Sequence, residues 1–251
     1  MARDFGGATG DYGIITSLQV TALPISVAFW ANVDSVADYG SFAQFGLSVS
    51  ADTYHRVLHE NAAPFRVYAQ SGNATSGFAV STTSQATGSW CHVAAVFASD
   101  TSRSIYLNGG GKATNTTSVL GFTPTRMTFM EYRNFSTLYP LNGKIQEIGI
   151  WNVALTDAEV YALSRAISPL SVRPDALGEY WPMLGRTSPE QNMVGGSAMT
   201  LNGTANQFAH NRMIRTRPRL VYVAPAAAGG GARRLVGSGF SLAGNGGGLA
   251  A

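Results

Sequence analysis

The sequence predicts an all-β fold, an antiparallel β-sandwich with one short helix and an extended C-terminal arm. Short runs of alternating apolar and polar residues follow one another, with Gly, Asn and Ser between them. The strand-helix alternation of a doubly wound, nucleotide-binding sheet is missing. A break in charge marks the arm: residues 1–190 hold 11 basic and 14 acidic side chains, whereas residues 191–251 hold six arginines and no acid.

Three segments show the strand pattern. In ISVAFWANV (25–33), every second residue from Ile25 onward is apolar, so these side chains share one face. In FRVYAQ (65–70), Phe, Val and Ala occupy one face and Arg, Tyr and Gln the other. The segment SWCHVAAVF (89–97) is apolar on both faces, which predicts a central strand that is covered on both sides.

Further along the chain, a turn and a helix are expected. Asn108-Gly109 ends a strand and predicts a hairpin. The segment KIQEIGIW (144–151) predicts a strand, but it alternates poorly and its inner face cannot be assigned from periodicity. Thr156 and Glu159 form a Ser/Thr-x-x-Glu capping box, and we expect one helix at about 156–166.

Composition excludes several classes. Charged residues make up only 12% of the chain. The chain contains no run of 18 apolar residues, which a helix needs to span a membrane. The N-terminal segment has no apolar stretch of the kind found in a secretory signal, so none is expected. Cys91 is the single cysteine, which excludes an internal disulfide framework.

Several motifs in this order resemble those of a known family. They are Phe5-x-Gly7 with Gly10-Asp11-Tyr12, Ile25 to Trp30, Trp90-x-His92-Val93-Ala94, Tyr106 to Gly109, and Gly143-x-Ile145-x-Glu147 with Trp151-Asn152-x-Ala154-Leu155-Thr156-x-x-Glu159. Their order is similar to that of the laminin-G/pentraxin branch of the concanavalin A-like lectin/glucanase jelly rolls. The resemblance covers roughly residues 3–208. It implies a sandwich domain at 1–208 with the short helix filling one end, and leaves 209–251 as the arm.

The family includes glycan binders, calcium-dependent lectins, scaffolds and glucanases, so the fold alone does not give the function. The resemblance implies that a hydrolase of this family would carry a Glu-x-Asp-x-Glu motif on one strand. At the corresponding place this chain has Gln146-Glu147, and no second carboxylate follows. We therefore expect no enzyme activity and no catalytic residue. The pentraxin-like calcium site implies acids before Gly143, where only Glu131 is acidic. Calcium is possible but unsupported, and we expect no cofactor; Asp11, Asp34, Asp38 and Asp52 are interpreted as solvated turn acids.

Other chemistry-bearing residues have ordinary interpretations. Cys91 and His92 are adjacent on a strand and therefore point to opposite faces, which excludes a dyad between them. His55 and His59 are interpreted as part of a solvated segment rather than as a metal pair. Aromatic side chains could stack on a sugar ring, although packing within the sandwich is the simpler interpretation for each. These aromatics are Tyr39, Tyr54, Tyr68 and Tyr132.

The arm is basic and then rich in glycine. Its last 26 residues contain nine Gly, so we expect no compact core there. We expect it to dock on another protein subunit, where a short LVYV strand could extend a neighbour's sheet. Nucleic acid is not expected, because no aromatic residues interleave the arginines. The expected contact residues are Arg212, Arg215, Arg217, Arg219, Leu220, Tyr222, Arg233, Arg234, Leu235, Phe240 and Leu242.

These features favour a non-enzymatic structural or binding protein. We expect a bacteriophage virion component, either a capsid decoration (cement) protein or a surface adhesion protein, anchored by its arm and forming a homo-oligomer. Its expected partners are capsid or other virion proteins, with a glycan as a further ligand. The alternative is a free carbohydrate-binding, lectin-like module that is cytoplasmic or released without a visible signal peptide, and a glucanase ranks third.

Overall fold

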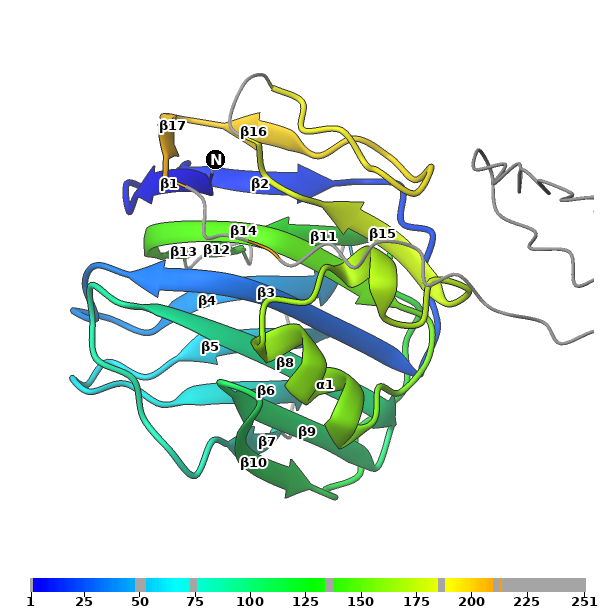
Figure 1. Ribbon diagram of the computed structural model, residues 1–251. Coiled ribbons are helices and arrows are strands. Elements are labelled where there is room, and N and C mark those ends of the chain that lie inside the picture. Colours follow the sequence, from blue (N-terminus) through cyan, green and yellow to red (C-terminus); the bar gives the residue numbers. More distant parts are fainter. Residues whose placement is uncertain are drawn as a thin grey trace, which may run out of the picture. The chain divides into compact units, whose positions relative to one another are not determined.

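The computed structural model describes residues 2–47, 53–72, 76–133, 138–184, 188–209 and 213. They form two large antiparallel sheets packed as a sandwich (Figure 1), which confirms the predicted fold class. No helix among these residues has the length and hydropathy that crossing a membrane requires.

The first sheet has eight strands in the described part of the chain. They are β1 (Ala2–Gly6), β3 (Ile25–Val33), β8 (Trp90–Ser99), β9 (Ser102–Leu107), β10 (Gly110–Asn115), β14 (Asn142–Trp151), β15 (Leu177–Trp181) and β17 (Ala205–Phe208). Their spatial order is β10-β9-β8-β3-β14-β1-β17, and β15 also pairs with β14. Strands distant in sequence are therefore neighbours, as a jelly roll requires.

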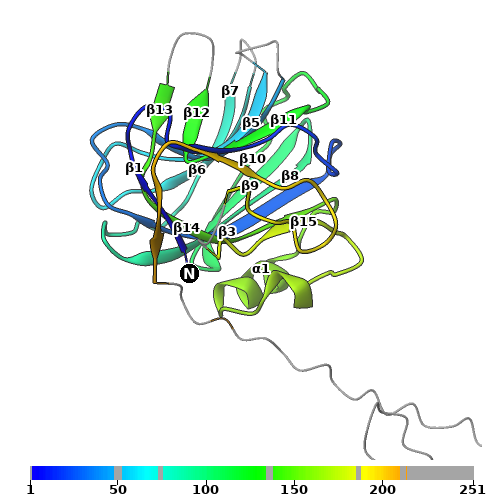
Figure 2. The same ribbon diagram turned by 90° about the horizontal axis from the view of Figure 1, so that it is seen from above.

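The second sheet has seven strands among the same residues. They are β2 (Tyr12–Ile15), β4 (Gly40–Gly46), β5 (Tyr54–His59), β6 (Val67–Gly72), β7 (Ser76–Val80), β11 (Arg126–Phe129) and β16 (Thr200–Asn202). Their order is β16-β2-β11-β4-β5-β6-β7, and Figure 2 shows this layer facing the first. A separate hairpin consists of β12 (Glu131–Arg133) and β13 (Leu138–Pro140).

The alternating patterns identified the core correctly. The alternate apolar residues of β3, from Ile25 to Val33, are all buried between the sheets. The strand β8 is covered on both faces as predicted: Val93 and Phe97 belong to the core between the sheets, whereas Ala94 and Val96 belong to a second cluster on the outer face.

The helix α1 (Asp157–Ser164) has Thr156 as its N-cap, and the side chains of Thr156 and Glu159 form the predicted capping box. Its buried residues Val160 and Leu163 join the second apolar cluster. The helix therefore lies against the outer face of the eight-stranded sheet (Figure 2) instead of filling an end of the sandwich, which corrects the expected position. A short 3-10 helix (Pro169–Ser171) follows.

Candidate functional site

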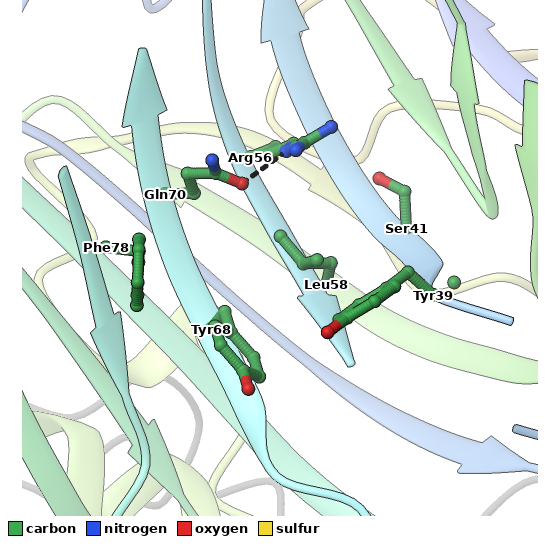
Figure 3. A pocket seen from close by; sticks show the side chains of 8 residues that line it. Tyr39, Ser41, Arg56, Leu58, Tyr68, Gln70 and Phe78 are labelled. Atoms are coloured by element: carbon green, nitrogen blue, oxygen red, sulfur yellow. Dashed lines mark hydrogen bonds between the residues drawn. The ribbon is translucent and has the colours of Figure 1, made fainter. Parts of the chain in front are cut away.

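A groove lies on the outer face of the seven-stranded sheet, across β4, β5, β6 and β7 (Figure 3). Its cavity volume is about 260 Å³. The residues that line it are Tyr39, Gly40, Ser41, Arg56, Leu58, Tyr68, Gln70 and Phe78.

Strand alternation explains why these side chains face outward. Val57 on β5 and both Val67 and Ala69 on β6 are buried in the core between the sheets. Because successive side chains point to opposite faces, Arg56 and Leu58 on β5, and Tyr68 and Gln70 on β6, project from the other face of the sheet. The pattern that builds the core thus also builds the groove.

Cross-strand pairing places these residues in two rows. In the first row, Arg56 is paired with Gln70, and Gln70 is paired with Phe78 on β7. In the second row, Leu58 lies between Ser41 on β4 and Tyr68 on β6. Residues that are directly opposite in antiparallel strands have Cβ atoms about 5 Å apart, so each row is a continuous set of neighbours.

Three aromatic rings give the groove a large apolar surface. The ring centroids of Tyr39 and Tyr68 are 6.5 Å apart with the planes at 81°, and those of Tyr68 and Phe78 are 6.1 Å apart. Tyr39 is 43% exposed and Phe78 is 49% exposed. Aromatic rings exposed side by side in a hollow are typical of a surface that receives a ligand.

Polar groups lie beside these rings. Arg56 donates a hydrogen bond from Nε to Oε1 of Gln70 over 2.8 Å, and its guanidinium carbon lies 4.4 Å from the centroid of the Tyr54 ring. The hydroxyl of Ser41 is buried and makes no hydrogen bond within the described residues. Ser41 belongs to the lining of the groove, but its hydroxyl oxygen is covered by protein atoms.

An ion pair at the end of β5 fixes the ring of Tyr68. The Tyr68 hydroxyl donates to Oε2 of Glu60 over 3.0 Å, while Arg66 donates to the same carboxylate from Nε and from a terminal nitrogen. The hydrogen bond from Arg66 lowers the pKa of Glu60 to about 2. The carboxylate is therefore charged at neutral pH and remains an acceptor for Tyr68.

The sequence also matches a family model. Residues 6–161 fit Laminin_G_3, described as the concanavalin A-like lectin/glucanases superfamily. The chain belongs to this superfamily. The resemblance seen in the sequence motifs is thereby confirmed, while no curated protein matches the sequence significantly.

Solved structures of the superfamily fold resemble this one at low identity. A heptameric SAP-like pentraxin from Limulus polyphemus has a TM-score of 0.58 at 12% identity, over 80% of this chain and 94% of its own. The CBM40 of a Ruminococcus gnavus IT-sialidase, bound to α2,3-sialyllactose, has a TM-score of 0.52 at 14% identity, over 65% and 98%. The active domain of tailspike protein 2 of bacteriophage CBA120 has a TM-score of 0.52 at 18% identity, over 70% and 29%.

The strand positions that were compared with the carboxylates of the superfamily's hydrolases lie outside the groove. Gln146 and Glu147 are buried on β14 in the eight-stranded sheet, and the hydroxyl of Tyr180 donates to Glu147 over 2.6 Å. The lining of the groove in the described residues contains no carboxylate. Glu147 therefore lies buried in the eight-stranded sheet and outside the groove, which is on the other sheet.

The acids considered for calcium are scattered. Among the described residues, no three His, Cys, Asp or Glu side chains form a group that could hold a metal ion. Glu131 is buried and accepts a bond from the N–H of Gly10. Asp11 is also buried, so its interpretation as a solvated acid is wrong. Its carboxylate accepts a hydrogen bond from the N–H of Thr204. Asp34 pairs with Lys144, Asp38 is exposed, and Asp52 lies outside the described residues.

Cys91 and His92 point to opposite faces of β8, as predicted. Cys91 is in the core between the sheets, and burial raises the pKa of its thiol to about 12. His92 is also buried, which lowers its pKa to about 3. A protonated thiol and a neutral imidazole on opposite faces cannot act as a nucleophile and its base.

The interpretation of His55 and His59 as a solvated segment is wrong. Each is 1% exposed, because both lie on the inner face of β5. The Nδ1 atom of His55 lies 2.8 Å from the hydroxyl of Ser71, and the His55 ring packs on Phe97. Residues four apart lie on one face of a strand as well as of a helix, so the spacing did not reveal the burial.

The groove was partly anticipated from the sequence. Tyr39 and Tyr68 were named as possible stacking residues and line it, while Tyr54 is buried beneath Arg56. The side chain of Tyr132 is not described. Arg56 and Phe78 were missed: alternation could have placed each on an outer face, but only the register of β5 with β6 and β7 brings them together.

The predicted contact residues of the arm lie outside the described residues, and so does the arm beyond residue 213. They stay a prediction from the sequence. The same holds for the boundary between residues 208 and 209, which nothing in the described part of the chain tests.

Proposed function

We propose that the protein is a non-catalytic glycan-binding module whose ligand lies in the groove on β4–β7. The observation that carries this proposal is the combination, in one hollow, of three aromatic rings with the polar groups of Arg56 and Gln70. A sugar ring has an apolar C–H face and a rim of hydroxyls. It therefore needs an aromatic platform and a few placed hydrogen-bonding groups, which this groove supplies.

The family and its structural relatives support this choice. The superfamily is named for lectins and glucanases, and a neighbour of the same fold is a module bound to sialyllactose. Hydrolysis of a glycoside ordinarily needs two carboxylates that flank the scissile bond. The described groove lining has none, which favours binding without cleavage.

Calorimetric titration against a panel of oligosaccharides tests the proposal. We expect Tyr68→Ala and Phe78→Ala each to weaken binding about tenfold, which corresponds to about 1.4 kcal/mol of lost stacking. The matched control is Tyr161→Ala, since Tyr161 is 56% exposed on α1, away from the groove. Groove variants that bind as tightly as the wild type would refute the proposal, provided that their urea unfolding curves match.

We propose as a second function that this module is a surface protein of a bacteriophage particle, a decoration or adhesion protein held by its arm. The fold similarity to a phage tailspike domain and the basic, acid-free arm support this. Its location would then be the virion, and its partners would be capsid or other virion subunits and further copies of this chain. The glycan groove would face outward from the particle.

Cosedimentation with purified particles tests the second function. We expect deletion of residues 212–251, and charge reversal of Arg215, Arg217 and Arg219 in the full chain, to abolish association without changing glycan affinity. The groove variant Phe78→Ala should weaken glycan binding and leave the association with particles unchanged. If the truncated protein still sediments with particles, the arm is not the anchor.

A further inference from the structure

The aromatic rings of the groove form an apolar stripe that runs across the strands. Tyr39, Tyr68 and Phe78 supply the rings. Figure 3 shows Tyr68 between the other two, and the side chain of Leu58, which is 7% exposed, between Tyr68 and Tyr39. The lining extends from Gly40 on β4 to Phe78 on β7, and three intervals of about 4.8 Å separate these strands. The stripe is therefore longer than the space that one sugar ring occupies.

The three rings face in different directions. The planes of Tyr39 and Tyr68 are inclined at 81°, and those of Tyr68 and Phe78 at 45°. The ring centroids in these two pairs are 6.5 and 6.1 Å apart. An aromatic ring packs its face on one apolar face of a sugar, so one sugar ring cannot stack on surfaces that are so strongly inclined. Consecutive units of a glycan are tilted relative to one another about their linkage, and they can therefore meet different rings.

Polar groups lie on both sides of the stripe. Arg66, Tyr68 and Gln70 occupy alternate positions, so the ring of Tyr68 has a polar residue on either side along the strand. The amide oxygen of Gln70 accepts from Arg56, and its NH₂ group makes no hydrogen bond within the described residues. The side chain of Arg66 is bonded to Glu60 and remains 48% exposed. A sugar chain that packs on its apolar faces presents hydroxyls along both edges, where these groups lie.

We propose that the ligand of the groove is a linear oligosaccharide of at least two consecutive pyranose units, which lies across the strands from β4 to β7. One unit stacks on Phe78, a following unit contacts Tyr39, and Tyr68 borders both. Hydroxyls on the two edges of the chain accept hydrogen bonds from the NH₂ group of Gln70 and from the guanidinium of Arg66. This inference rests on the proposed glycan-binding function and specifies the length and the direction of the ligand.

NMR titration of the full-length chain tests the length of the ligand, because it also measures weak affinities. The probes are the mono-, di- and trisaccharides of β-1,4-linked glucose, α-1,4-linked glucose, β-1,4-linked xylose and β-1,4-linked N-acetylglucosamine. We expect at least one series to bind, with an affinity that rises about tenfold from the monosaccharide to the trisaccharide, because a second aromatic ring is then contacted. A ligand that used one ring alone would gain affinity only in proportion to its number of units.

Substitutions at the two ends of the stripe test the direction of the ligand. We expect Tyr39→Ala and Phe78→Ala each to weaken trisaccharide binding about tenfold, whereas only one of them weakens binding of the monosaccharide. The control Tyr161→Ala, at an exposed tyrosine on α1, should change neither affinity. The same spectra show whether each variant is folded.

The outcomes separate this inference from the function on which it rests. If a monosaccharide binds as tightly as its trisaccharide, or if trisaccharide binding is sensitive to only one end of the stripe, the inference is overturned and the glycan-binding function stands. If no probe of the four series binds, both are overturned.

Discussion

Arg3 and Glu190 form a buried ion pair, with Nε of Arg3 2.9 Å from Oε1 of Glu190, although they lie 187 positions apart in the sequence. Each side chain is 7% exposed. A terminal nitrogen of Arg3 also donates to the carbonyl of Ala205 over 2.9 Å. Arg3 therefore joins the first strand to the last strand, β17, and to the segment that precedes β16.

Replacing Glu190 with Ala should lower the free energy of unfolding by about 3 kcal/mol, because it leaves the charge of Arg3 buried without this carboxylate. Urea denaturation measures the change. The control is Arg173→Ala, which removes a partly exposed pair with Glu159 at 3.6 Å and should cost less than about 1 kcal/mol. Equal losses in the two variants would show that the burial of the Arg3 pair has no energetic consequence.

The capping box should contribute measurably to stability. Thr156 Oγ1 accepts the N–H of Glu159, and the Glu159 carboxylate accepts the N–H of Thr156 over 2.8 Å. We expect Thr156→Ala to lower the unfolding free energy by about 1 kcal/mol, measured in urea. Thr156→Ser keeps the oxygen and should stay close to the wild type. A serine variant as unstable as the alanine variant would point to the lost methyl group instead.

The hairpin between β9 and β10 depends on Asn108. Asn108 and Gly109 have φ values of 54° and 75°, the left-handed region that this two-residue turn requires. The side-chain oxygen of Asn108 also accepts the N–H of His92 on β8 over 2.9 Å. We expect Asn108→Ala to cost about 2 kcal/mol in thermal or urea unfolding. Asn108→Asp keeps the oxygen and should retain most of that stability, and a loss as large as that of alanine would contradict this account.

Periodicity predicted the strands well where the ladder is regular and failed at a bulge. Ile145 lies in the core between the sheets, and so do Ile148 and Ile150, although the first two are three positions apart, an odd spacing that would place them on opposite faces of a regular strand. The pairing of β14 with β3 shifts between Gln146 and Gly149, and Glu147 has a φ of 55°. The bulge reverses which residues face inward, so no single alternation fits 144–151. The inner face of this strand was therefore not readable from the sequence.

The groove was less predictable than the sandwich for a related reason. Alternation identifies the outer face of β5 and of β6 separately, and Tyr68 was named only as one of four aromatic side chains that could stack on a sugar ring. The contact between Arg56 and Gln70, however, depends on the register of two strands that are joined by a loop. The position of α1 was mistaken because its apolar residues, Val160 and Leu163, specify burial but not the surface against which they pack.

The three buried histidines of the described residues, His55, His59 and His92, should make the fold sensitive to acid, because burial lowers the pKa of each. Burial lowers the pKa of His55 and of His92 to about 3, well below the usual value of 6.5. His92 has a buried Nδ1 without a hydrogen bond in the described residues, and its ring lies 5.5 Å from that of Trp30. In the unfolded chain, the imidazoles of His55 and His92 bind protons as the pH falls through about 6.5. In the folded protein, they stay neutral until the pH approaches 3.

From pH 6.5 down to about pH 3, the unfolded chain binds protons that the folded chain does not. The free energy of unfolding should therefore fall as the pH falls, by up to about 1.4 kcal/mol per pH unit for each histidine. His92→Phe keeps the aromatic contact with Trp30 and removes one of these groups, so its stability should fall less steeply. Urea unfolding of both proteins between pH 7 and pH 4 measures the difference in slope, in which the shared titration of carboxylates cancels. Parallel curves would mean that His92 accepts a proton in the folded protein, and that its burial does not hold it neutral.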